Sequence, residues 1–156
     1  VKSLRNRVSE ALLNFQDKGL TVEERGGRVY VSLEAKLLFA SGSTAVSAEG
    51  QGALKELAKA IENEKDLDIL VEGHTDADKI LGNTAAYKDN WDLSVMRATS
   101  VVRIMMDNSS IDPTQLTAAG RGEHMPVDPA EKAKNRRIEI ILIPDLDQLF
   151  ELINEN

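Results

Sequence analysis

The sequence predicts an α/β sandwich of the α+β type, in which helices cover one face of a mixed sheet. Two apolar stripes at helical spacing, one after residue 47 and one after residue 90, alternate with short segments in which apolar and polar residues alternate. Strands separated by helices need crossover connections, so part of the sheet should be parallel. A chain of 156 residues with 42% hydrophobic content can form one compact domain with its own core.

The N-terminal segment is predicted to form an amphipathic helix, because its apolar residues recur at helical spacing and Gly19 follows where helices commonly end. The helix either covers the domain or ends a longer helical or coiled-coil spacer. Its apolar stripe consists of Leu4, Val8, Ala11, Leu12 and Phe15.

A β-hairpin is predicted next. Segments 20–25 and 28–33 alternate apolar and polar residues around Gly26-Gly27, and a two-residue hairpin turn needs the positive φ that glycine adopts without strain. We expect residues 1–32 to form the helix and hairpin as an N-terminal extension, and residues 33–156 to form the main domain.

The main domain is predicted to contain two longer helices. Ser47 can cap the first, and the second begins near Asn90 or Asp92 and ends at Asn108. Between Phe39 and the first helix lies a loop of small residues, which is either an ordinary turn or a place where the backbone approaches a ligand closely.

Three strands and a terminal helix complete the prediction. One strand, with apolar residues at 67, 69 and 71, ends at Gly73; a short strand covers 115–119, and the last covers 137–143. The last strand is so apolar that both its faces are expected to be covered. Apolar residues after Pro144 predict a short C-terminal helix that packs back on the domain.

Charge and composition exclude several functions. With 19 basic and 26 acidic residues the net charge is -7, and no basic patch stands out, so nucleic acid is not expected as a partner. The absence of cysteine excludes disulfides, thiolate nucleophiles and cysteine-ligated zinc. No apolar run approaches the roughly 20 residues of a membrane span. Since Val1 is no natural start, membrane attachment is expected only through other parts of the parent protein.

Thr75 and Asp76 follow the strand that ends at Gly73. Ligands of open α/β sheets usually bind beyond the carboxyl ends of the strands. On position alone, a carboxylate there is a helix cap, a solvated loop acid or a ligand contact.

Arg97 shares a helical row with Leu93 and Val101 within the first two turns of its helix. A cation at the positive end of the helix dipole, beside an apolar face, is unfavourable unless an anion meets it. Either a ligand anion or an internal salt bridge with Asp76 meets that requirement, although such a bridge would be weak evidence for stability.

Three blocks carry a family resemblance: VEGHTD (71–76), NWDLSVMRA (90–98) and NRRIEI (135–140). In this order they resemble the OmpA-like peptidoglycan-binding domain, with the NWDLS form similar to the flagellar-stator and Bacteroidetes-type branch. The resemblance runs from about residue 33 to 143. It implies a βαβαββ core, no catalysis, no cofactor and no metal.

The resemblance also implies a ligand and its contacts. Meso-diaminopimelate in the peptidoglycan stem peptide offers a free ammonium, which Asp76 would accept, and a free carboxylate, which the two-pronged guanidinium of Arg97 would grip. Arg136 would add positive potential on the same side. Three further residues match positions of the family pocket: Thr75, Asn90 and Leu93.

Two segments depart from the family pattern. The stretch 77–89 is longer than its commonest form, so the rim of the pocket is expected to carry an extra loop. The stretch 127–134 is shorter than in many members, which puts contacts from that loop in doubt.

Catalysis and metal binding have only weak signals. His74, Asp76 and Asp78 form a H-x-D-x-D string, but no helical metal-binding spacing accompanies it. His74 is expected to orient the strand-end loop through hydrogen bonds. Ser94 lacks the G-x-S-x-G context of a nucleophile and is expected to cap its helix.

Trp91 has two interpretations, as a packing residue or, at this mouth, as a contact for a sugar or the stem peptide.

The resemblance therefore predicts a noncatalytic wall-binding domain that anchors an outer-membrane or envelope protein of a Gram-negative bacterium, on the periplasmic side. The alternative is a stator-type anchor of an ion-driven membrane motor complex, and a homodimer is left open.

Overall fold

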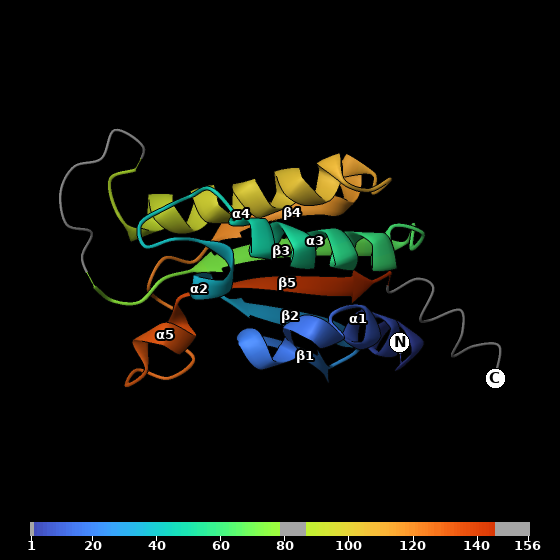
Figure 1. The fold of residues 1–156 in the computed structure, drawn as a ribbon, viewed down its shortest axis with the longest axis horizontal. Coiled ribbons are helices and arrows are strands. Elements are labelled where there is room, and N and C mark those ends of the chain that lie inside the picture. Colours follow the sequence, from blue (N-terminus) through green and yellow to red (C-terminus); the bar gives the residue numbers. More distant parts are fainter. Residues whose placement is uncertain (1, 79–86, 146–156) are drawn as a thin grey trace.

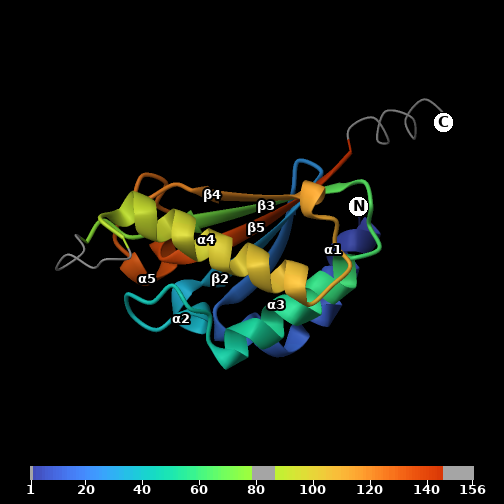
Figure 2. The ribbon, with the colours of Figure 1, turned by 90° about the horizontal axis from the view of Figure 1, so that it is seen from above.

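A five-stranded mixed sheet with helices on one face forms the framework of the molecule, as predicted (Figures 1 and 2). The computed structural model describes residues 2–78 and 87–145. The strand order is β1-β2-β5-β3-β4. The helix predicted after Pro144 lies outside the described residues.

The N-terminal region combines a helix with a hairpin. Helix α1 (Lys2–Ala11) is shorter than predicted, because the chain tightens into the 3-10 helix η1 (Leu13–Lys18), a common way for a helix to end. Gly19, with φ of 94°, terminates it. Leu4, Val8 and Leu12 are buried, so this segment covers the domain.

Strands β1 (Leu20–Arg25) and β2 (Arg28–Glu34) form the predicted hairpin, with Gly26 and Gly27 at φ of 58° and 80°. Strand β2 also pairs with β5 (Arg137–Pro144). The predicted division after residue 32 falls within β2 and stays a prediction.

The helices of the main domain begin at side-chain caps. Ser47 Oγ accepts a hydrogen bond from the Gly50 amide at 3.1 Å and starts α3 (Ala48–Ile61), as predicted. Helix α4 (Asn90–Asp107) is capped by Asp89, which accepts from the Asp92 amide. The predicted capping role of Ser94 is therefore wrong, because the chain already offers an Asx cap one residue before the helix.

The remaining elements are short. They are α2 (Ala35–Leu38), β3 (Leu67–His74), η2 (Pro113–Gln115), β4 (Leu116–Gly120) and α5 (Lys132–Asn135). Strands β3 and β4 are parallel, as the crossover argument requires, whereas β5 is antiparallel to both β2 and β3. One end of the sheet therefore combines the carboxyl ends of β2, β3 and β4 with the beginning of β5.

Strand β5 was predicted to be covered on both faces, but in the structure the longer described helices cover only one of them. Ile138, Ile140 and Leu142 face the helices and are at most 1% exposed. On its other face lie Arg137, Glu139 and Ile141, and none of the longer described helices, α1, α3 and α4, covers that face (Figure 2). The central position of β5 between β2 and β3, rather than a second helical layer, limits its exposure there.

Two glycines let α4 approach the sheet closely. Gly73 and Gly120 are partners in the β3–β4 register. A Cβ atom on Gly73 would lie 2.0 Å from the Ser94 carbonyl oxygen, and one on Gly120 would lie 2.5 Å from Ser94 Oγ. Gly73 has no positive φ, so what it supplies is this close approach rather than an unusual backbone conformation.

Among the residues that the structure describes, no helix combines the length and apolar character of a membrane span.

Candidate functional site

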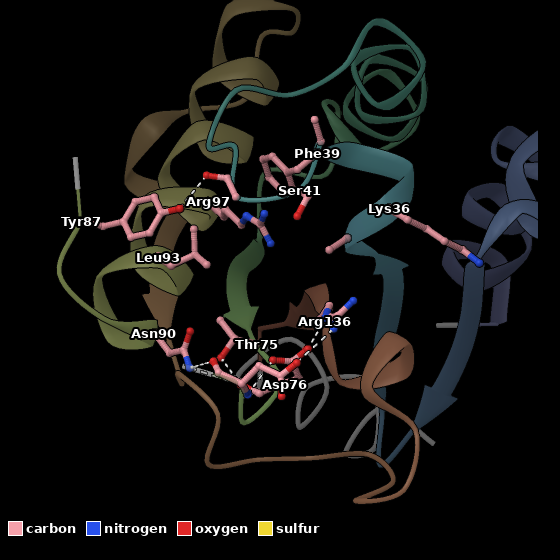
Figure 3. A pocket seen from close by; sticks show the side chains of 14 residues that line it. Lys36, Phe39, Ser41, Thr75, Asp76, Tyr87, Asn90, Leu93, Arg97 and Arg136 are labelled. Carbon is pink, nitrogen blue, oxygen red and sulfur yellow. Dashed lines mark hydrogen bonds and ion pairs between the residues drawn. The ribbon is translucent and has the colours of Figure 1, made fainter. Parts of the chain in front are cut away.

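A cavity of about 480 Å³ opens at the end of the sheet where β3 ends and β5 begins (Figure 3). Its wall is built from α2 and the loop that follows it, the segment after β3, the first turns of α4, and the residue before β5. All six residues predicted for the site line it: Thr75, Asp76, Asn90, Leu93, Arg97 and Arg136.

Asp76 is buried and already oriented. One carboxylate oxygen, Oδ1, accepts a hydrogen bond from the Asp78 amide at 2.9 Å. The other, Oδ2, forms an ion pair with Nε of Arg136, whose side chain is half exposed. A charged partner and a backbone donor therefore fix the orientation of the carboxylate at the cavity wall.

The loop that carries Asp76 is fastened on both sides. The Thr75 amide donates to the Gly122 carbonyl at 2.8 Å, which ties the loop to the end of β4. The Asn90 side chain donates to the carbonyl of Asp78 at 3.0 Å and, at 3.3 Å, to that of Asp76. Asn90 therefore connects the first turn of α4 to the strand-end loop.

Arg97 reaches the cavity from α4 and is only 7% exposed. Its Nε donates to the Ser43 carbonyl at 2.9 Å, and its guanidinium carbon lies 4.7 Å from the centre of the Phe39 ring. Burial, the main cause, lowers the pKa of Arg97 from its ordinary value. Within residues 2–78 and 87–145, no carboxylate forms an ion pair with it.

Asp76 and Arg97 therefore do not form the internal salt bridge that the sequence left open. Asp76 pairs with Arg136 instead, so Arg136 contacts the carboxylate directly rather than only adding positive potential. In Figure 3 the Arg97 guanidinium and Asp76 lie on opposite sides of the cavity. Among the described residues, the site thus combines a carboxylate paired with Arg136 and a buried guanidinium that no carboxylate pairs with.

The loop of small residues also belongs to the site, although its sequence is equally typical of an ordinary turn. Tyr87 donates from its hydroxyl to the Gly42 carbonyl at 2.7 Å, and Ser100 of α4 donates to the Thr44 carbonyl at 2.7 Å. Together with the bond from Arg97 to Ser43, these contacts hold the loop against α4. Phe39 and Tyr87 were not among the predicted site residues, because nothing in the local sequence distinguishes them from core residues.

The two departures from the family pattern have different outcomes. Most of the long stretch, residues 79–86, lies outside the described residues. The shortened stretch 127–134 runs into α5 and supplies Lys132, which forms an ion pair with Asp78 at 2.7 Å on the rim.

A second polar cluster lies on the sheet face away from the helices. Glu72 and Glu139 are partners in the β3–β5 register, and His74 Nε2 lies 3.0 Å from Glu72 and 3.5 Å from Glu139. His74 thus contacts these two carboxylates and not the strand-end loop that it was predicted to orient; the bond from Thr75 to Gly122 orients that loop.

This cluster could supply three metal-ligand atoms within 4.8 Å of one another, a set that sequence spacing does not reveal because Glu139 comes from a distant strand. Two guanidinium groups already balance its carboxylates: Arg137 lies 3.2 Å from Glu139, and Arg121 lies 3.6 Å from Glu72. A divalent cation would compete with both arginines, which makes the cluster a poor cation site.

The folded protein disfavours the charged form of His74. Burial is the main cause that lowers its pKa, the Arg137 guanidinium is the second, and the hydrogen bond with Glu72 opposes them. Among the described residues His74 Nδ1 has no hydrogen-bond partner, which suits an unprotonated nitrogen.

We expect acid to destabilise the fold through His74. As pH falls below about 6.5, the unfolded chain takes up a proton that the folded protein binds only at lower pH, so the free energy of unfolding should decrease until the folded pKa is reached. Urea titrations from about pH 7.5 to 5 should show this slope in the wild type and a flatter one in His74→Gln. The control is His124→Gln, which changes the exposed histidine; an equal flattening in both variants would contradict the assignment.

Comparisons with known proteins find a matching family and several relatives of part of this chain. The model of the OmpA family matches residues 38–139. Motility protein B of Bacillus subtilis is 30% identical over 118 residues, which are 73% of this chain and 44% of that protein. The chain spans about half the length of the curated relatives that it matches.

Solved structures resemble the chain over nearly its whole length. The cell wall anchor of the T6SS from Pseudomonas aeruginosa has a TM-score of 0.79 and 32% identity, and the match covers 90% of this chain and 99% of that one. A putative MotB-like protein from Desulfovibrio vulgaris has a TM-score of 0.78 and 26% identity, with 92% and 95% covered.

Proposed function

The chain belongs to the OmpA family, and on this premise we propose that it is a noncatalytic domain that binds cell-wall peptidoglycan through the diaminopimelate of the stem peptide. The observation that carries this proposal is the buried guanidinium of Arg97 at the cavity wall. A buried charge without a charged partner is costly, and a ligand carboxylate would supply that partner.

The ligand end fits the chemistry of the cavity. The distal stereocentre of diaminopimelate carries an ammonium and a carboxylate on one carbon atom. Arg97 would take the carboxylate with the N–H groups that its bond to Ser43 leaves available. Asp76 would take the ammonium, and Leu93 and Phe39 would contact the methylene groups of the side chain.

Arg136 has two opposing effects on this ligand. Its ion pair orients Asp76 before the ligand arrives, which lowers the ordering cost of binding. It also shares the carboxylate with the incoming ammonium. Because the Arg136 side chain is half exposed, it can move toward solvent and pair with Asp78, which lies 3.7 Å from its terminal nitrogen.

A pull-down with insoluble peptidoglycan tests the proposal. Asp76→Asn and Arg97→Gln each remove one charge from the cavity and should weaken binding about tenfold or more, because each leaves a charged ligand group without its partner. Circular dichroism and the melting transition should stay close to those of the wild type. Matched controls are Asp68→Asn in β3 and Arg103→Gln in α4, both exposed and outside the cavity, which should bind as the wild type does. Wild-type binding by folded Asp76→Asn and Arg97→Gln would reject the proposed site.

The domain would act on the periplasmic side of the envelope and fasten its parent protein to the wall. Two parents fit: an outer-membrane or envelope protein, or the stator of an ion-driven motor, which the similarity to motility protein B favours. Deleting the parent gene in the source bacterium distinguishes them. Loss of swimming with flagella still assembled would indicate the stator, and outer-membrane blebbing with normal swimming would indicate the general anchor.

A further inference from the structure

Trp91 is half exposed (50%) although it stands in the first turn of α4. One face of the ring packs over Gly122, where an added Cβ would lie 3.4 Å from the indole, and the His124 ring centre lies 5.0 Å away. The contact with His124 and Gly122 fixes the position of the indole and leaves part of it open. Packing, one of the two roles that the sequence suggested for Trp91, therefore explains the buried half of the side chain but not the exposed half.

The two segments that meet beside Trp91 carry further exposed apolar side chains. Of the six large hydrophobic residues found exposed in the described structure, Trp91, Val95, Met125 and Val127 belong to the start of α4 and the segment after β4. These two segments meet at Gly122. A single exposed apolar residue needs no explanation, whereas several on two adjoining segments are typical of a binding surface.

The group adjoins the cavity through two connections. Asn90 lines the cavity and immediately precedes Trp91. Gly122, under the indole, accepts the hydrogen bond from Thr75, which also lines the cavity. A ligand that leaves the cavity past Asn90 and Thr75 therefore approaches the segments that carry Trp91 and Gly122.

We propose that Trp91 stacks against a sugar ring of the glycan strand that carries the stem peptide; this rests on the proposed function. One face of an amino-sugar pyranose is lined by C–H groups, which suit the indole face, and its N-acetyl methyl group suits Val95 or Met125. No described residue accepts a hydrogen bond from the Trp91 indole N–H, so a sugar hydroxyl can accept it. Neutral sugars are also compatible with a chain of net charge -7.

The chain contains one tryptophan, so tryptophan emission reports on the surroundings of Trp91 alone. The test titrates three ligands by fluorescence and calorimetry: the free diaminopimelate tripeptide, the same tripeptide on its disaccharide, and the disaccharide alone. The disaccharide-linked peptide should change the emission and bind more tightly than the free peptide. In Trp91→Ala its affinity should fall about tenfold, whereas the affinity for the free tripeptide should not change.

Two variants serve as controls for effects of Trp91→Ala on packing and for effects of removing any exposed apolar side chain. Trp91→Phe keeps an aromatic face and should retain most of the gain from the disaccharide, which a loss of packing alone would not predict. Met106→Ala removes an exposed apolar side chain from the far end of α4 and should bind all ligands as the wild type does. Sedimentation at the titration concentrations checks for self-association.

The outcomes separate the two proposals. Equal losses for the free and the disaccharide-linked peptide in Trp91→Ala, or no loss for either, would overturn the sugar contact. A mass that falls from dimer to monomer in Trp91→Ala would assign the surface to a second copy of the chain and overturn it as well. If the free tripeptide fails to bind the wild type, the proposed function fails, whereas a fluorescence change with the disaccharide alone would still support the sugar contact.

Discussion

Stem peptides that carry lysine in place of diaminopimelate should bind roughly 30-fold to several thousandfold more weakly. Lysine lacks the distal carboxylate, so the buried guanidinium of Arg97 would be desolvated by the ligand without gaining a charged partner. Truncating one member of such a pair costs on the order of 2–5 kcal/mol, and each 1.4 kcal/mol corresponds to about a tenfold change in affinity. Calorimetric titration of both soluble peptides at one salt concentration measures the difference.

A third peptide, with the distal carboxylate amidated, provides the matched control. Its amide oxygen still accepts a hydrogen bond from Arg97 but carries no charge, so its affinity should lie between the other two. Equal affinities for the diaminopimelate and lysine forms would remove Arg97 from the proposed role.

Gly73→Ala should destabilise the fold by about 3 kcal/mol or more, which corresponds to a decrease in Tm of roughly 6–12 °C for a chain of this size. The new Cβ would lie 2.0 Å from the Ser94 carbonyl oxygen, and this atom belongs to helix backbone that cannot rotate away. Helix α4 would have to move off the sheet, and Arg97 would move with it. Thermal melts followed by circular dichroism measure the change, and any folded fraction should bind the stem peptide poorly.

A second glycine offers a control with the opposite sign. Gly52 lies within α3, where an added Cβ would meet only Phe15, at 3.9 Å. Gly52→Ala should therefore raise stability by up to about 1 kcal/mol, because alanine favours the helix. A Tm for Gly73→Ala equal to that of the wild type would contradict the close approach of α4 to β3.

Local signals in the sequence were sufficient for most elements. The hairpin, the longer helices and the strands could be predicted because their signals lie within a few residues of the sequence. These signals are the apolar periodicity, Gly26-Gly27 and the Ser47 cap. The 3-10 helix after Ala11 was not predicted, because apolar spacing alone does not separate it from a continuing α-helix. The strand order depends on pairing between distant segments that single-sequence patterns do not encode. The same holds for the face of β5 that none of the longer described helices covers.

The same distinction holds for the site. The sequence blocks placed six residues in one cavity, but they did not determine which charges pair. The antiparallel register of β3 and β5 sets His74 opposite Arg137, so the segment after β3 and the residue before β5 lie side by side, and there Arg136 pairs with Asp76. The cluster of Glu72, His74 and Glu139 follows from the same register and was missed for the same reason.

The orientation of the sheet has a mechanical consequence. The cavity lies at one end of the strands, and the described chain begins at Lys2 and ends at Asp145 near the other end (Figure 1). A force applied between a ligand held in the cavity and either chain end therefore acts roughly along the strands. Because the hydrogen bonds between strands run across that direction, such a force loads them together in shear instead of opening them one after another. The domain should yield at high force when pulled along this axis and at much lower force when β1 or β4 is peeled from its edge.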